Sequence, residues 1–259
     1  MSLNDINPTI KAFSVVLSVL LLSIFFDPVT PSMSIALIVT ITFLFGNVSF
    51  KRWILLFSPF LFIALIYVWS SMWFPEIKPS DHILWQWKFL GLTEEGLKRS
   101  ISLALRVLSF ASLSLLFVLT TKPIDFILSL MQQCKLSPKL AYGIMAGYRF
   151  LPTIKEELNT VRDAHRIRGI ASERTWKGKL YAIKRYVIPL LASAVRKAER
   201  TALAMESKGF TGNRNRTYYR KMTVKSKDWL FLALIISIIL FSILTSWYSG
   251  YLQLYKHEM

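Results

Sequence analysis

The sequence predicts an all-α integral membrane protein with about five transmembrane helices and a basic cytoplasmic insert between the fourth and fifth spans. The 259-residue chain is 53% hydrophobic and nevertheless carries a net charge of +17. The charge is local: residues 122–228 hold 23 of the 32 Lys and Arg residues but only 8 of the 15 acidic ones, or +15 of the +17. A soluble nucleic-acid binder does not explain the hydrophobic content, and a disordered basic tail does not explain 18 Phe and 8 Trp.

Five apolar runs are candidate spans, since a helix needs about 20 mostly apolar residues to cross a bilayer. They cover residues 12–26, 33–48, 53–74, 101–119 and 229–248. The first two are short and are joined by a proline-containing turn, so we expect two tightly packed helices. Trp229, Trp247 and Tyr248 lie at the ends of the last run, where interfacial aromatic residues are typical. Residues 1–11 lack the basic start of a cleaved signal peptide, and we expect none.

Lys and Arg residues in the short loops indicate the orientation. The turn at residues 27–32 has none, whereas Lys11 precedes the first run and Lys51 and Arg52 precede the third. We therefore expect the N-terminus inside the cell and the C-terminus outside. The predicted domains are residues 1–121 with four transmembrane helices, a basic cytoplasmic domain of amphipathic helices at 122–228, and residues 229–259 with the fifth span and an external C-terminus.

Helical patterns continue through the insert. Residues 123–131 read as an amphipathic helix with Pro123 in its first turn and Thr121 as a candidate cap. Residues 138–151 are apolar but too short to span, and Gly143 and Gly147 would let a helix approach closely. Two longer helices follow, with apolar seams at spacings of three and four. These seams are Ile154, Leu158, Val161 and His165 in the first helix, and Leu191, Val195, Ala198, Ala202 and Met205 in the second.

The two longer helices end alike. Arg168 and Gly169 close the first, and Lys208 and Gly209 close the second. Glycine is the usual residue of a left-handed C-cap, and the helix dipole favours a cation there by about 0.3–1 kcal/mol. The dipole explains one such ending, but the repetition of cation, glycine and apolar residue favours a shared binding role. The basic surface around the two ends fits anionic lipid headgroups or an acidic protein partner.

No sequence motif indicates an enzyme. The three histidines, His82, His165 and His257, are far apart, and the single cysteine, Cys134, excludes a disulfide framework. No phosphate loop, nucleophile elbow or zinc-protease motif occurs. We therefore predict a non-catalytic protein with no metal site and no cofactor of its own.

Arg106 is the one charge inside the fourth predicted span. An ionisable residue within a membrane is costly and often functional. Because Arg106 lies near the start of the span, its side chain could equally extend to the outer interface beside Arg99. The sequence leaves these two interpretations open.

Two function classes can be weighed on the patterns described so far. An autonomous secondary transporter or channel with a basic cytoplasmic domain should show paired spans broken by Gly or Pro, and Pro59 is the only proline within a confident span. A membrane-tethered nucleic-acid binder is suggested by aromatic residues such as Trp176 and Tyr181 among the basic ones, but we expect no nucleic-acid partner.

An ordered set of motifs from Arg106 onward resembles the transmembrane (T) component of energy-coupling factor (ECF) transporters, the EcfT/CbiQ/BioN-like family. The motifs are Arg106, residues 120–125 (TTKPID), residues 148–152 (YRFLP) before Glu156, residues 163–169 (DAHRIRG) and residues 202–210 (ALAMESKGF). Each motif alone is weak evidence for the family, whereas the ordered set is specific to it. The predicted spans before Arg106 match in hydropathy only.

The resemblance implies a membrane scaffold whose cytoplasmic coupling helices cross in an X, each ending in an Ala-Arg-Gly-like triplet that inserts into a groove of one ABC-type ATPase. Here the triplets are Ile167-Arg168-Gly169 and Ser207-Lys208-Gly209, supported by His165, Arg166, Met205, Glu206 and Phe210. Lys208 replaces the usual arginine and cannot bind a carboxylate bidentately, which suits two ATPases that differ.

The resemblance also implies the partners and the location. The partners are two ABC-type ATPases, which bind ATP and Mg, a membrane substrate-binding S component, and membrane lipid. The expected function is uptake of a vitamin or transition-metal ion across a bacterial cell membrane.

Overall fold

The computed structural model describes residues 3–73, 83–87, 90–169 and 176–250 of the chain. Its contacts divide the chain into two units. The bundle unit comprises residues 1–129 and 222–259, and the helix-pair unit comprises residues 130–221. The predicted insert at 122–228 contains the whole helix-pair unit and a few flanking residues. Its cytoplasmic location stays a prediction.

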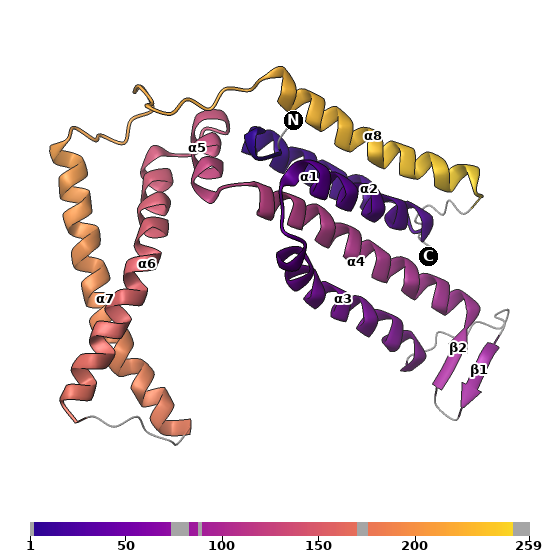
Figure 1. Ribbon diagram of the computed structural model, residues 1–259, viewed down its shortest axis with the longest axis horizontal. Helices are drawn as coiled ribbons and strands as arrows, with labels where there is room; N and C mark the ends of the chain where they lie inside the picture. The colour runs from indigo at the N-terminus through magenta and orange to yellow at the C-terminus, as the bar shows by residue number, and fades with distance from the viewer. Residues whose placement is uncertain (1–2, 74–82, 88–89, 170–175, 251–259) are drawn as a thin grey trace, which may run out of the picture. The chain divides into compact units, whose positions relative to one another are not determined.

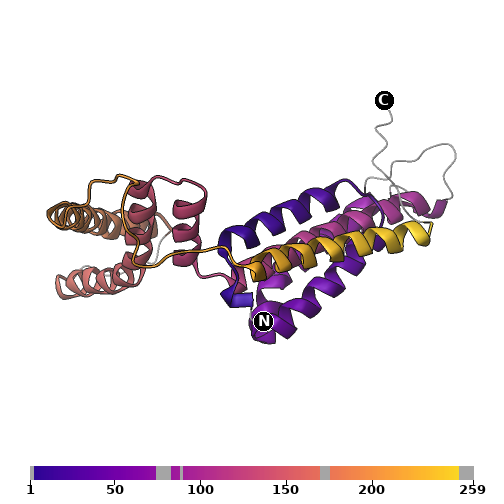
Figure 2. The same cartoon turned by 90° about the horizontal axis from the view of Figure 1, so that it is seen from above.

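Long helices lying alongside one another form the bundle unit (Figures 1 and 2). Its elements are η1 (Leu3–Asp5), α1 (Pro8–Ser23), α2 (Val29–Gly46), α3 (Phe50–Trp73), β1 (Ile83–Trp87), β2 (Leu90–Thr93), α4 (Glu94–Thr120) and α8 (Ser226–Tyr248). The central helix is α4, which contacts α1, α2 and α3, while α8 packs on α1 and α2. The all-α class is thereby confirmed.

The bundle core combines large apolar residues with small hydroxyl residues. Ile38, Leu116 and Ile235 come from α2, α4 and α8, and all three are fully buried. Ser34 and Ser242, also buried, meet where α2 packs on α8, with their Oγ atoms 3.2 Å apart. Small residues let membrane helices approach closely, and their hydroxyls bond to backbone carbonyls of the preceding turn. The small residues therefore allow α2 and α8 to pack closely.

Four helices of the described residues are long and apolar enough to cross a membrane: 29–46, 50–70, 96–120 and 226–248. They match four of the five predicted spans. The first predicted span, 12–26, becomes α1, which has only 16 residues, about 24 Å at 1.5 Å per residue. That length is short of a hydrocarbon core of about 30 Å. The helix starts earlier than predicted because Asn7 caps its start, and it stops earlier, at Ser23, with Ile24 as its C-cap residue.

A β hairpin precedes α4, and the sequence analysis did not predict it. Strands β1 and β2 pair antiparallel, with Trp85 opposite Leu92 and Trp87 opposite Leu90. The helix α4 then starts at Glu94, seven residues before the predicted span at Ile101. Hydropathy marks only the part of a helix that is apolar enough for the membrane, so it misses the polar first turns of α4.

The helix-pair unit is built on two long helices, α6 (Pro138–Ile167) and α7 (Trp176–Ser207). The helix α5 (Pro123–Gln133) begins in the bundle unit and ends in the helix-pair unit. The prediction of a separate short helix at 138–151 is wrong, because α6 continues through Pro152 for 30 residues. Pro152 lies at an exposed position, where the loss of one backbone N–H donor disturbs no packed neighbour.

Candidate functional site

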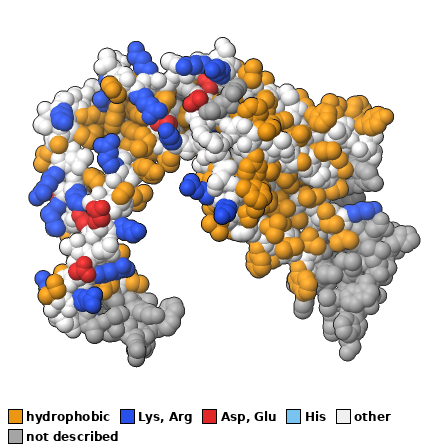
Figure 3. Space-filling view, viewed as in Figure 1, with side chains coloured by type: hydrophobic (Ala, Val, Ile, Leu, Met, Phe, Trp, Pro, Cys, Tyr) orange, Lys and Arg blue, Asp and Glu red, His pale blue; other side chains and the backbone are white. Residues whose placement is uncertain are grey.

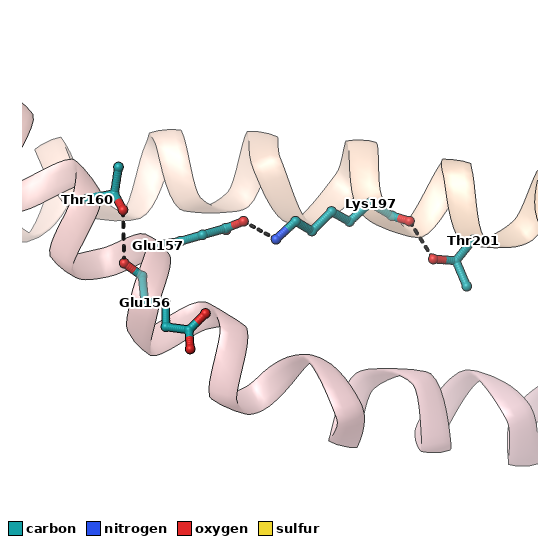
Figure 4. A network of polar contacts seen from close by, with 5 residues as sticks. All are labelled: Glu156, Glu157, Thr160, Lys197 and Thr201. Carbon is teal, nitrogen blue, oxygen red and sulfur yellow. Dashed lines mark hydrogen bonds and ion pairs between the residues drawn. The ribbon is translucent and has the colours of Figure 1, made fainter.

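The two long helices of the helix-pair unit run antiparallel and cross (Figure 1). An ion pair joins Glu157 of α6 to Lys197 of α7 at the crossing (Figure 4). Further along α6, the His165 ring packs edge-on against the Tyr186 ring with centroids 5.6 Å apart. The crossing of two helices that the resemblance implies is thus present in the structure.

The ion pair changes the acidity of its carboxylate. Lys197 Nζ donates a hydrogen bond to Glu157 Oε1, and this contact holds the pKa of Glu157 below its ordinary value. A hydrogen bond from Ser193 and the positive charge of Arg196 act in the same direction, while burial opposes them. Glu157 therefore stays ionised at neutral pH, and the crossing is held by a charged contact as well as by the rings.

The face of α7 that meets α6 differs from the predicted seam. On α6, Leu158, Val161 and His165 are half-buried as predicted, but Ile154 is exposed. On α7 from residue 183 onward, the half-buried residues are Tyr186, Leu190, Ser193, Lys197, Thr201 and Met205, so only Met205 of the predicted seam is among them. Leu191 and Val195 are 60% and 57% exposed, and Ala198 and Ala202 are also exposed. The apolar pattern marks a face that no described part of this chain covers.

Lys208 forms the C-cap of α7. The Gly209 N–H donates to the Glu206 carbonyl oxygen over 2.8 Å, and the Phe210 N–H donates to the Met205 carbonyl oxygen over 2.9 Å. These two bonds are the Schellman pair, which requires a left-handed residue after the cap. Gly209 supplies it with φ = 80°. The prediction of a left-handed glycine at this end is confirmed.

Phe210, the next residue, turns back onto the start of α6. Its ring centroid lies 5.4 Å from that of Tyr142. The Arg216 guanidinium lies over both rings, 4.9 Å from Tyr142 and 5.2 Å from Phe210. The aromatic pair and the Arg216 cation therefore hold the end of α7 against α6 within the same unit. The neighbouring Lys208 side chain is exposed. Tyr142 and Arg216 were not singled out from the sequence, since they are far from the glycine motif along the chain.

Arg168 occupies the same position at the end of α6. It is the C-cap residue, and the following Gly169 has φ = 71°. The Gly169 N–H donates to the Arg166 carbonyl oxygen over 3.1 Å, which matches the bond from Gly209 to Glu206. The next residue, Ile170, lies outside the described residues. Both predicted ends thus have a cation at the cap and a glycine in the left-handed region.

The two cations are held far apart. Glu157 and Lys197 mark the crossing, and Arg168 and Lys208 each follow their helix's crossing residue by eleven positions, or about 16 Å. Because the helices run antiparallel, their ends point in opposite directions and lie up to about 33 Å apart. A single small ligand cannot reach both cations. The arrangement offers two separate positive contacts for one large partner or for two partners.

The residues predicted to support the ends have varied surroundings. Ile167 is 87% exposed, and Arg166, Glu206 and Ser207 are also exposed. His165 and Met205 are half-buried between the helices, and His165 Nδ1 is buried with no hydrogen-bond partner. The ends therefore present one apolar residue and several polar ones around each cation. Over α6 and α7, Lys and Arg side chains are scattered across the visible face (Figure 3).

Arg106 lies within the bundle unit beside the turn between α1 and α2. Its guanidinium donates to the Phe25 carbonyl oxygen and lies 3.9 Å from the Phe26 ring centroid. The neighbouring Asp27 is fully buried, and its Oδ2 accepts from Thr30 and from the Ser246 hydroxyl, 2.6 Å away. These contacts anchor the turn to α4 and α8, a structural role that neither sequence interpretation of Arg106 contained.

Three buried charges escaped the sequence analysis. Lys11, Asp27 and Asp228 are between 0% and 3% exposed. Lys11 was interpreted only as a positive charge flanking the first span. The available signal was that each lies within a few residues of the end of an apolar run. Among the described residues, no group of three His, Cys, Asp or Glu residues is placed to hold a metal ion.

The sequence was compared with known proteins. The model of the CbiQ family, described as "Cobalt transport protein", matches residues 1–219. The energy-coupling factor transporter transmembrane protein EcfT of Bacillus subtilis is 30% identical over 84% of this chain and 90% of its own length. The EcfT protein of Staphylococcus aureus is 26% identical over 91% and 89%, and that of Limosilactobacillus fermentum is 32% identical over 61% and 62%.

The family match covers the bundle helices up to α4 and the whole α6–α7 pair. It therefore includes both helix ends and three of the four helices that are long and apolar enough to cross a membrane. The chain belongs to the CbiQ family, the transmembrane T components of energy-coupling factor transporters.

Proposed function

We propose that this chain is the membrane scaffold of an ECF-type ABC importer. It couples ATP binding and hydrolysis by two partner ATPases to a substrate-binding S component that takes up a vitamin or a transition-metal ion. The observation that carries the proposal is the pair of cation-capped helix ends, Arg168 and Lys208, which point in opposite directions from the crossing of α6 and α7.

Each helix end docks in one ATPase subunit. The exposed cations suit an acidic groove, and Ile167 and the chain around Gly209 add apolar and backbone contacts. Arg168 can bind a carboxylate through two parallel hydrogen bonds, whereas Lys208 acts as a point charge. The two docking grooves therefore differ in geometry, which fits a pair of non-identical ATPases.

The exposed apolar faces of the pair supply the contact with the S component. Leu140, Ile144 and Leu151 of α6 are 52–60% exposed. Gly143 and Gly147 lie on the same side, and an added Cβ at either would meet nothing within 4 Å. Such a flat apolar face lets a partner helix approach its backbone closely. Membrane lipid covers the remaining apolar surface of the bundle.

The chain lies in a bacterial cytoplasmic membrane with its N-terminus inside and its C-terminus outside. The helix pair is then on the cytoplasmic side, where ATP is available. ATP and Mg bind to the partner ATPases, and this chain is a non-catalytic subunit without a cofactor of its own. When the ATPases close on ATP, the helix ends move with their grooves, and the stiff crossed helices carry the motion to the S component.

Co-purification tests the proposal directly. A tagged wild-type chain is isolated from native membranes and its companions are identified by mass spectrometry, alongside Arg168→Ala and Lys208→Ala. Lys155→Ala, which removes an exposed cation of α6 away from its end, is the matched control. We expect two ATPases with the wild type and the control, and selective loss of one with each cap variant. A wild-type chain that purifies without any ATPase and transports without ATP in liposomes would instead indicate the secondary transporter.

A further inference from the structure

The chain that follows α7 is bound to the start of α6 and to the end of α5. Residues 210–221 form no helix or strand, and Figure 1 shows them within the coil that leaves the end of α7. They belong to the helix-pair unit, together with residues 130–133 at the end of α5. There, Gln132 donates to the Arg220 carbonyl oxygen over 2.9 Å. We name residues 210–221 the clasp.

The clasp begins with an aromatic contact. The Phe210 ring meets the Tyr142 ring of α6 edge-on, with the centroids 5.4 Å apart. The Arg216 guanidinium lies over both rings, 4.9 Å from the centroid of Tyr142 and 5.2 Å from that of Phe210. An aromatic face attracts a cation through its quadrupole. Because Phe210 and Arg216 are six positions apart, this cluster folds the first half of the clasp onto α6.

The backbone of the clasp also passes close to the start of α6. Gly212 has φ = 75°, and a Cβ at this position would lie 2.5 Å from Lys139 Cε. The guanidinium of Arg214 donates to the Lys135 carbonyl oxygen, just before α6 begins. The clasp therefore follows one path along the start of α6, and glycine at position 212 allows the close approach.

The clasp controls the cap that carries Lys208. The last turn of a helix frays unless the chain beyond it is held. The Phe210 N–H closes the cap by donating to the Met205 carbonyl oxygen, and the Phe210 ring is the group that Tyr142 and Arg216 hold. The aromatic cluster therefore keeps the last turn of α7 closed, and with it the direction in which the exposed Lys208 points.

We propose that Tyr142 and Arg216 are positioning residues for the Lys208 end of α7. By holding the clasp, they keep this cation in the geometry that its ATPase binds. The inference rests on the docking of Lys208 proposed above. A contact that is ordered before binding binds more tightly, because less conformational entropy is lost. Loss of the cluster should therefore weaken the ATPase contact at Lys208 and leave the contact at Arg168 unchanged.

The test is co-purification of ATPases with the tagged full-length chain from native membranes, quantified by mass spectrometry. Lys208→Ala and Arg168→Ala identify the ATPase at each end. The test variants are Tyr142→Ala and Arg216→Ala. Tyr142→Phe keeps the ring and Arg216→Lys keeps the cation, so both are rescue variants. Lys221→Ala is the matched control, since it removes another exposed cation of the clasp.

We expect each test variant to lower recovery of the ATPase at Lys208 by up to about fivefold and to leave the ATPase at Arg168 at the wild-type level. Tyr142→Phe and Lys221→Ala should retain both ATPases, and Arg216→Lys should recover most of the loss.

Equal loss of both ATPases would overturn the proposal, because a positioning role at one end is selective. Wild-type recovery in both test variants, while Lys208→Ala still loses its ATPase, would overturn it and leave the transport function untouched. If Lys208→Ala itself loses no ATPase, the proposed docking fails, and the positioning role fails with it.

Discussion

The bundle unit and the helix-pair unit differ in where they place charged residues and in whether they enclose an apolar core. In the bundle, Lys11, Asp27 and Asp228 are buried and bonded, and the core is closed around Ile38 and Leu116. In the helix pair, the cations at both helix ends are exposed, and so are apolar residues such as Leu191. Both units expose apolar side chains, but among the described residues only the bundle also encloses a large buried apolar cluster.

The largest expected effect is a difference in unfolding free energy between one substitution in the bundle unit and one in the helix-pair unit. Leu116→Ala in the fully buried bundle core should lower the free energy of unfolding by about 2–5 kcal/mol through the lost contacts and the cavity. Val195→Ala on the exposed face of α7 should change it by no more than about 0.5 kcal/mol. Unfolding in mixed detergent and denaturant micelles measures both. Equal losses of unfolding free energy in the two variants would contradict the distinction between the buried core of the bundle and the exposed face of α7.

A pair of glycine substitutions sharpens the comparison within the helix pair. Gly209→Ala puts a side chain at φ = 80° and should cost about 1–2 kcal/mol of backbone strain. Gly143→Ala has the same added methyl group in a helix interior with no neighbour within 4 Å, and should stabilise α6 by about 0.5–1 kcal/mol. Thermal melts of the purified chain compare the two. Destabilisation by both variants would mean that Gly143 already faces a packed neighbour.

The smallest expected effect is a pH dependence at the crossing. Because the folded chain lowers the pKa of Glu157 below its ordinary value of 4.5, the contact with Lys197 contributes stability at pH values above 4.5. That contribution is lost as the pH falls through the lower, folded value. The yield of a chemical cross-link between α6 and α7 should therefore fall in acid, and this fall should be absent in Glu157→Gln. An unchanged acid response in that variant would assign the effect to another group.

Much of the candidate site could be predicted from the sequence because its geometry is local. A Schellman end needs only the last turn of a helix and the glycine after it, so the pattern around Arg168 and Lys208 was enough to predict both caps. The distance between the two cations was not predictable from the pattern. It depends on which residues of α6 and α7 meet, and the choice of Lys197 over the neighbouring Val195 is made by the partner helix.

The sequence by itself determined the apolar helices, the basic segment between them and the two cation-glycine ends, because hydropathy and helix capping act over a few residues. Only the tertiary structure decided that α6 runs through Pro152 and that Lys11 is a buried bond donor instead of a surface charge. The burial of Lys11 depends on a group distant in the sequence, Thr120. A charged residue near the end of an apolar run gives the same sequence pattern in two different situations. Its side chain can be solvated by water, or it can be hydrogen-bonded to a carbonyl oxygen of another helix.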